Sequence, residues 1–97
     1  MNKVKDFIKY FRKILPEYDQ LLTGNVIFRE RSIGIGNLSL EDAISYGVTG
    51  PSGRASGFSC DVRKLEPYSA YDRIEFNEIL FNQGDTYHRY LARIEEM

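Results

Sequence analysis

The sequence has few residues of the types that build metal centres and disulfides. Its 97 residues include one cysteine, Cys60, one histidine, His88, and no tryptophan. A single cysteine excludes an intrachain disulfide and any site with several thiolate ligands, and it fits a reducing, cytoplasmic setting. A lone histidine needs a carboxylate such as Asp85 or Glu95 beside it to act as a general base. Because Asp85 precedes it by three residues, we interpret His88 as a structural residue that pairs with Asp85.

The sequence also lacks a charge imbalance and a long apolar run. Thirteen Lys and Arg residues face fourteen Asp and Glu residues, so no overall positive field attracts nucleic acid. No apolar run exceeds four residues, which is too short to span a bilayer, and the start MNKVKDFIKYFRK is amphipathic and unlike a secretory signal. A hydrophobic content of 42% with 28% charged residues indicates a globular chain of at most one domain.

The clearest predicted element is a helix over residues 3–23. Its apolar residues recur at steps of three and four and form one stripe: Val4, Phe7, Ile8, Phe11, Ile14, Leu15, Tyr18, Leu21 and Leu22. Pro16 lacks an N–H group and is expected to kink this helix. Gly24 is suited to follow its last turn.

Two short helices are predicted after this one. Asn25 is an expected N-cap for a helix over residues 26–32. Ser39 is an expected N-cap for a helix over residues 40–46, which Gly47 would end. Start signal, apolar positions and stop signal agree for the second of these helices.

The second half of the chain is predicted to be an ordered loop followed by a helix. Residues 47–72 are expected to form the loop, and its glycine-rich part is expected to be irregular. A short β-hairpin is a further possibility at residues 74–81. Asp85 or Thr86 is placed to cap a last helix over residues 86–97. We therefore predict a mainly α fold, a small helical subdomain with an ordered Gly/Arg-rich loop.

The Gly/Arg-rich loop is the strongest candidate for chemistry. Its glycines let backbone N–H groups converge on an anion, and Arg54 adds a forked donor. However, no Gly-Lys-Ser/Thr sequence ends the loop and no strand precedes it, so it is not a P-loop. We favour the interpretation that Arg54 ties down backbone carbonyls or a carboxylate.

The remaining candidates have simple structural interpretations. Arg63 favours a reactive Cys60 thiolate and Asp61 opposes it, so we expect a small, partly buried cysteine. The seven tyrosines suit amphipathic positions and an interface between subunits better than stacking on nucleic acid, because acidic residues are interleaved with the basic ones. Glu95 and Glu96 are expected to be solvated helix charges.

Three blocks of the sequence together resemble one protein family. They are LLTGNVIFRERSIGIGNLSLEDAISYGVTGP, GRASGFSCDVRKLEPYSAYD and GDTYHRYLARIEEM. The order GP-x-x-R-A-S-G, D-x-R-K, PY-x-x-YD and GD-x-Y-x-R-Y resembles the D subunit of the respiratory NADH:quinone oxidoreductase (complex I), which is related to the large subunit of nickel–iron hydrogenases. The resemblance extends from about residue 14 to the end, and it implies that residues 1–97 are a single internal fragment of a longer polypeptide, ending within a helix.

The resemblance also implies a function for the parent protein. The family transfers electrons from NADH through FMN and iron–sulfur clusters to quinone, coupled to ion translocation, in a peripheral arm on the cytoplasmic side of the inner cell membrane. Its D subunit forms the quinone pocket with the small iron–sulfur subunit. The quinone-binding histidine and tyrosine of the family lie upstream of the matching segment, so no catalytic, cofactor-binding or metal-binding residue is assigned to this chain. The isolated fragment is expected to be soluble, inactive and prone to self-association.

Structural or interface roles are expected instead for a few residues in and beside the loop. Arg54 is expected to pair with Asp61 or Asp72, and the other predicted anchors are Arg63, Tyr68 and Tyr71. Three alternatives stay open at this stage: a fragment of a membrane-bound nickel–iron hydrogenase-like large subunit, a small anion-binding module that uses the loop, and a helical interaction module that uses residues 3–23.

Overall fold

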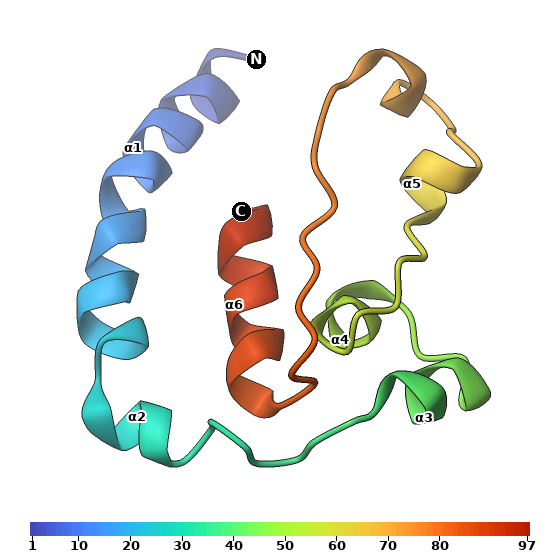
Figure 1. Cartoon of the computed structure of the whole chain (residues 1–97). Coiled ribbons are helices and arrows are strands. Elements are labelled where there is room, and N and C mark those ends of the chain that lie inside the picture. Colours follow the sequence, from blue (N-terminus) through green and yellow to red (C-terminus); the bar gives the residue numbers. More distant parts are fainter. The chain divides into compact units, whose positions relative to one another are not determined.

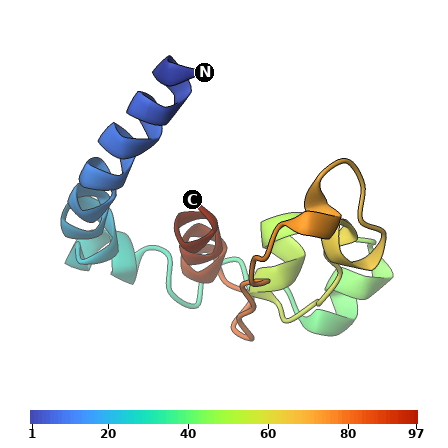
Figure 2. The ribbon, with the colours of Figure 1, turned by 90° about the horizontal axis from the view of Figure 1, so that it is seen from above.

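The computed structural model describes all residues from 1 to 97 and confirms the mainly α fold, with helices and no strand. The chain divides into two compact units, Met1–Arg31 and Ser32–Met97. Figures 1 and 2 show the helices of each unit from two directions. None of these helices combines the length and the apolar character that crossing a membrane requires.

The first unit consists of three helical segments. Helix α1 spans Asn2–Tyr18 and includes Pro16, and it continues directly into a π-helical segment, η1, at Asp19–Thr23. The predicted element over residues 3–23 is therefore helical throughout, but its hydrogen-bond pattern widens after the proline. Wider turns of this kind accommodate a helix whose regular ladder is interrupted.

Helix α2 spans Val26–Glu30 and begins at the predicted cap. The Asn25 side chain accepts a hydrogen bond of 3.1 Å from the backbone N–H of Phe28, which satisfies one of the free donors of the first turn. The helix ends two residues earlier than predicted. No residue of the first unit is buried, so this unit has no core of its own.

The second unit starts with a loop and helix α3, Leu40–Ser45. The Ser39 hydroxyl accepts a hydrogen bond of 3.0 Å from the backbone N–H of Asp42 and donates one of 2.8 Å to the carboxylate of Asp42, which confirms the predicted cap. Gly47 follows with a φ of 64°, a left-handed conformation that favours glycine at a helix end.

The prediction of an irregular glycine-rich segment is wrong for its central part. Helix α4 spans Gly50–Ala55. Pro51 lies in its first turn, where a fixed φ and a missing N–H group favour helix initiation. Gly53 lies inside this helix at a position that has no room for a side chain, because a Cβ atom there would be 2.6 Å from the carbonyl oxygen of Val48. Close packing therefore explains Gly53, whereas Gly47, Gly50 and Gly57 have positive φ values of 64°, 67° and 85°, a left-handed conformation that favours glycine.

Beyond α4 the chain forms two short helical segments and an extended return. Helix α5 spans Val62–Leu65 and the 3-10 helix η2 spans Tyr71–Arg73. Residues 74–81 form no β-hairpin. The N–H group of Phe81 instead donates 3.0 Å to the carbonyl of Arg54, so the return segment satisfies a carbonyl at the end of α4 rather than pairing with itself.

The last helix, α6, spans Thr86–Glu96 and packs against α4. Ala55 of α4 and Ala92 of α6 are fully buried, and small side chains allow two helices to approach closely. The buried apolar residues of the unit are Ala43, Ala55, Tyr87 and Ala92. This core is small, so polar contacts have a large share in positioning α4 and α6.

Candidate functional site

Arg54 is the centre of the candidate site. It lies in the last turn of α4 and only 5% of its surface is exposed. A buried guanidinium requires nearby carboxylates, because an unpaired charge in a protein interior is strongly unfavourable. The residues that surround Arg54 therefore define what this part of the fold can do.

The main partner of Arg54 is Glu96 at the end of α6. Nη2 of Arg54 donates a hydrogen bond of 2.9 Å to Oε2 of Glu96. Nε lies 2.7 Å from Oε1, but it makes no hydrogen bond in this geometry, so the second contact is an ionic one. Glu96 as a whole residue is exposed, as expected, but its side chain is 19% exposed and pairs with Arg54, and this pairing was not predicted.

The second carboxylate is Asp61, one of the two predicted partners. Its Oδ2 lies 3.9 Å from Nη1 of Arg54, and its side chain is 3% exposed. The other predicted partner, Asp72, contacts the exposed Arg73 at 3.6 Å instead. Asp61 was therefore correctly predicted to lie beside Arg54, whereas Asp72 belongs to a separate surface pair.

Asp61 joins Arg63 to this cluster. Nε and Nη2 of Arg63 donate hydrogen bonds of 2.9 Å and 2.5 Å to Oδ1 and Oδ2 of Asp61, and Oδ1 also caps α5 by accepting from the backbone N–H of Arg63. Hydrogen bonding by the Arg63 side chain lowers the pKa of Asp61 to about 2, against the opposing effect of burial. The same hydrogen bonds raise the pKa of Arg63.

These four residues form a network of alternating charges, Glu96–Arg54–Asp61–Arg63, which we call the ion network. Its two cations and two anions cancel. The pairs near its centre are the least exposed, and buried pairs of this kind hold groups in place more than they add net stability. The network connects the end of α6, the end of α4 and the start of α5.

An aromatic cluster lies beside the ion network. Tyr68 and Tyr71 contact edge to face with ring centroids 5.0 Å apart, and Tyr71 contacts Phe76 at 6.0 Å. The guanidinium carbon of Arg63 lies 4.8 Å from the centroid of Phe76, and Nζ of Lys64 lies 5.3 Å from it. Arg63 thus connects the ion network to the aromatic cluster through a cation–π contact.

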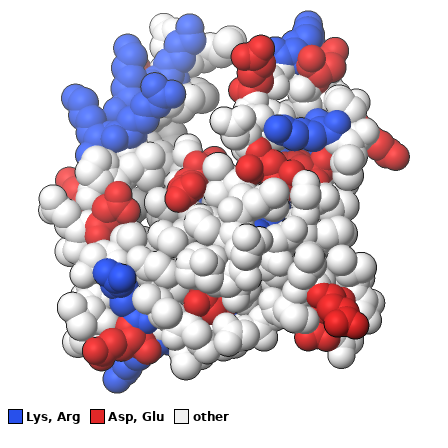
Figure 3. Space-filling view, in the orientation of Figure 1, with Lys and Arg blue, Asp and Glu red and all other residues white.

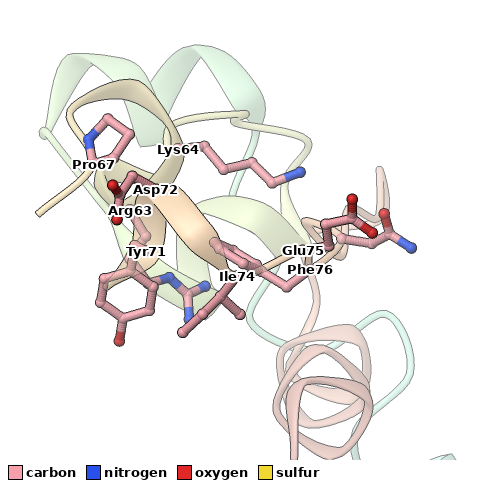
Figure 4. Close-up of a pocket in the computed structure, with 9 residues that line it drawn as sticks. Arg63, Lys64, Pro67, Tyr71, Asp72, Ile74, Glu75 and Phe76 are labelled. Atoms are coloured by element: carbon pink, nitrogen blue, oxygen red, sulfur yellow. The ribbon is translucent and has the colours of Figure 1, made fainter. Parts of the chain in front are cut away.

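Three pockets border Arg63. One, about 750 Å³, is bordered by α5, η2 and the start of the return segment, and Figure 4 shows Arg63, Tyr71 and Phe76 among the residues that line it. A second, about 280 Å³, is lined by Arg54, Cys60, Asp61, Arg63 and Tyr68 together with Thr49, Gly50 and Val62. A third, about 330 Å³, lies between Arg63, Phe76 and Glu96. All five predicted anchors therefore line the first or the second of these pockets. Cys60 is partly buried, as predicted.

A second polar cluster lies at the start of α6. Asp85 accepts hydrogen bonds from the backbone N–H groups of Gly34 and His88, each 2.8 Å long, and lies 2.6 Å from Nδ1 of His88. The predicted pairing of Asp85 with His88 is confirmed. Burial alone would raise the pKa of Asp85, but these hydrogen bonds outweigh it and lower the pKa.

Sequence reasoning missed Arg89, which completes this second cluster. Its guanidinium donates to the carbonyl of Gly84 at 2.6 Å and to the carbonyl of Gly36 at 2.9 Å. Arg89 therefore performs the carbonyl-binding role that was considered for Arg54. The spacing in the sequence could have indicated this role, because Arg89 follows the N-cap Asp85 by one helical turn and therefore faces the same preceding loop.

Neither cluster has the composition of a metal centre. No group of three or more His, Cys, Asp or Glu side chains in residues 1–97 is arranged to hold a metal ion. In both clusters the carboxylates are already satisfied by arginines, backbone N–H groups or a histidine. Both clusters join helix ends to loops.

The class of this chain follows from comparison with known families. All 97 residues match the family described as the 49 kDa subunit of the respiratory-chain NADH dehydrogenase. The chain therefore belongs to that family, and the resemblance inferred from the three sequence blocks is confirmed.

Individual relatives agree with this assignment. The chain is 54% identical over 97 residues to the C/D subunit of NADH-quinone oxidoreductase from Phocaeicola vulgatus, and this match covers the whole chain and 19% of the relative. It is 51% identical over 95 residues to the D subunit of NADH-quinone oxidoreductase from Magnetococcus marinus, which covers 98% of the chain and 24% of the relative. The chain therefore spans about a fifth to a quarter of the length of these relatives.

A solved structure has the same fold. It is a chain of the membrane-bound sulfane sulfur reductase, described as an archaeal respiratory membrane complex. The TM-score is 0.92 at 37% sequence identity, and the match covers 98% of this chain and 26% of that chain.

Proposed function

We propose that these 97 residues are part of the D subunit of an NADH:quinone oxidoreductase. The observation that supports this most strongly is the identity of 50% or more to D and C/D subunits along the full length of the chain. In the parent complex, electrons pass from NADH through FMN and iron–sulfur clusters to quinone, and this transfer is coupled to ion translocation. The small iron–sulfur subunit is the neighbour that we propose for this part of the complex, on the cytoplasmic side of the membrane.

The role proposed for this segment is structural. Its buried carboxylates and arginines are paired with each other, with His88 or with backbone groups, which supports a role in joining helices and loops. We assign to Arg54, Asp61 and Arg63 the joining of α4, α5 and α6, and to Tyr68 and Tyr71 a contact surface for a neighbouring subunit. Tyr68 supports the last assignment, because it is 57% exposed and exposed tyrosines are frequent in protein interfaces.

The proposal is tested with Arg54→Ala in the full-length polypeptide. We expect less assembled complex and, in proportion, less NADH:quinone reductase activity, because Asp61 and Glu96 lose the cation between them. Arg73→Ala is the matched control, since its guanidinium contacts only an exposed aspartate and is itself 76% exposed. Normal assembly and activity of the Arg54→Ala complex would contradict the structural role.

A second candidate function differs in the electron acceptor. The likeness to a sulfane sulfur reductase chain at 37% identity favours a related respiratory membrane complex that reduces a sulfur compound. Assays of the purified parent complex with quinone and with polysulfide as alternative acceptors separate the two functions. Reduction of quinone alone supports the first, and reduction of polysulfide alone supports the second.

A further inference from the structure

The segment between α5 and η2 contains a residue in an unfavourable backbone conformation. Ser69 has a φ of 58° and is the only residue other than glycine with a positive φ. In this left-handed region the Cβ atom of an L-residue comes too close to a carbonyl oxygen, whereas glycine adopts it at no steric cost. A residue that is held there indicates a constraint imposed by its surroundings.

Ser69 is the second residue of a four-residue turn that begins at Tyr68. The backbone N–H group of Tyr71 donates a hydrogen bond of 3.1 Å to the carbonyl of Tyr68, which closes the turn. The third residue, Ala70, has a φ of −108° and a ψ of 1°. A positive φ followed by a negative one is the pattern of a type II′ turn, in which glycine is usual at the first central position. The turn therefore has serine where glycine is expected.

The side chain of Ser69 does not account for this conformation. Serine hydroxyls can stabilise turns by bonding to nearby backbone groups, but this hydroxyl makes no hydrogen bond within residues 1–97. The residue is also exposed, so no packing of its side chain fixes the backbone. The neighbouring residues must therefore hold the turn.

Aromatic contacts supply this constraint. The rings of Tyr68 and Tyr71 meet edge to face, with centroids 5.0 Å apart and an interplanar angle of 65°, which is a preferred arrangement of aromatic pairs. Tyr71 contacts Phe76 in the same way at 6.0 Å, and Pro67 precedes the turn with a fixed φ. Because the turn brings the two tyrosine rings together, the conformation of Ser69 is coupled to the position of Tyr68.

Tyr68 is the member of this cluster that is available for a further contact. It is 57% exposed, whereas Tyr71 and Phe76 are partly buried. Its ring is held on one side and open on the other. A tyrosine that is already fixed loses little conformational freedom when it binds, which favours contacts between proteins.

The charged residues near the turn do not favour a partner of one sign. Lys64, Glu66, Asp72 and Arg73 are exposed there, two cations and two anions. Figure 3 shows side chains of both signs together over α5 and η2. The ring and hydroxyl of Tyr68 are therefore the features that a partner can recognise.

We infer that the turn Tyr68–Tyr71 is a preorganised contact element and that Ser69 is the residue that positions Tyr68 within it. The partner that fits is a protein surface with an apolar recess for the ring and a hydrogen-bonding group for the phenol hydroxyl. This inference rests on the proposed contact of Tyr68 with a neighbouring subunit. It adds the backbone conformation on which that contact depends.

Site-specific photo-crosslinking in the full-length polypeptide within its native complex tests the inference. A benzophenone amino acid replaces Tyr68, and position 69 is left unchanged or altered by Ser69→Gly, Ser69→Ala or Ser69→Val. Glycine adopts a positive φ freely, alanine less readily and a β-branched residue least. We therefore expect the crosslink to a neighbouring subunit to be kept with Ser69→Gly, to weaken with Ser69→Ala and to fall about fivefold or more with Ser69→Val.

Ser45→Val is the matched control, because it makes the same exchange at an exposed helical position of α3. It is expected to leave the crosslink unchanged. All yields are measured per assembled complex. If Ser69→Val prevents assembly, the comparison of Ser69→Gly with Ser69→Ala decides.

The possible results separate this inference from the proposed function. Equal yields with Ser69→Gly and Ser69→Ala, or a lost crosslink with Ser69→Gly, overturn the positioning role and leave the contact of Tyr68 intact. A crosslink from position 68 only to its own polypeptide or to lipid, or no crosslink, overturns the contact and the inference together. The NADH:quinone reductase activity of the same complexes is measured in parallel, and its absence in the wild-type complex refutes the proposed enzyme without affecting the turn.

Discussion

Glu96 provides the sharpest test of the ion network, because the adjacent residue Glu95 is also a glutamate but lies outside the network. Glu96→Ala removes the carboxylate that lies 2.9 Å from Nη2 of Arg54. Arg54, 5% exposed, is then left with Asp61 at 3.9 Å, and Asp61 is already engaged by Arg63. Two cations then share one anion in a largely buried site.

The magnitude follows from this geometry. Removing one partner of a buried ion pair costs about 3–5 kcal/mol. The Glu96 side chain is 19% exposed and Asp61 still faces Arg54, so we reduce the expected loss to about 2–3 kcal/mol. For a domain of this size, the melting temperature falls by about 4–8 °C per kcal/mol. The predicted decrease is therefore about 10–20 °C.

The assay is thermal unfolding followed by circular dichroism, with Glu95→Ala as the control. Both substitutions remove the same atoms from adjacent positions of α6, so helix propensity and net charge change equally. Both glutamates are exposed as whole residues, but only Glu96 contacts Arg54, so removal of Glu95 is expected to change stability by less than about 0.5 kcal/mol. A double-mutant cycle with Arg54→Met then isolates the coupling between the two residues. If Glu96→Ala and Glu95→Ala melt within about 2 °C of each other (about 0.5 kcal/mol), the network does not hold α6.

Three further predictions follow from other contacts. The pKa of Asp61 is lowered from 3.8 to about 2, which corresponds to about 2 kcal/mol of folding stability. This stabilisation is present above about pH 4 and is lost as the pH falls toward 2. The stability advantage over Asp61→Asn, which keeps an N-cap, should therefore shrink across that window in urea titrations; a constant difference would refute the ionic origin. Gly53→Ala should destabilise the fold by about 1–3 kcal/mol, because its Cβ would lie 2.6 Å from a carbonyl oxygen, and unchanged urea unfolding would contradict this packing. Asp85→Ala removes three hydrogen bonds, so faster amide exchange is expected at Gly34, and unaltered exchange would show that the cap is dispensable.

The features that could be predicted from the sequence are the local ones. The caps at Asn25, Ser39 and Asp85 depend on side chains that accept hydrogen bonds from backbone groups three residues away, and such contacts are encoded in short spacings. The apolar stripe of α1 is also a local pattern, set by the helical repeat. The pairing of Asp85 with His88 is predictable for the same reason.

The features that could not be predicted depend on contacts between distant segments. Glu96 is 42 residues from Arg54, and nothing in its local sequence distinguishes it from Glu95. Whether a helical glutamate pairs with a distant arginine depends on which side of the helix meets a neighbour. The absent hairpin has the same origin, because the N–H group of Phe81 bonds to the carbonyl of Arg54, a partner that strand propensity does not reveal.

The small core of the second unit explains why polar residues define its architecture. Five polar or charged residues are buried, compared with four apolar ones, of which three are alanines. Alanines permit the close approach of α4 and α6, but they make few directional contacts, so they leave the helices free to slide or rotate. The ion network and the Asp85 cluster each require particular groups at particular distances. Because these distances restrict how the helix ends can be arranged, we expect the buried charges to favour the observed arrangement, even where they add little net stability.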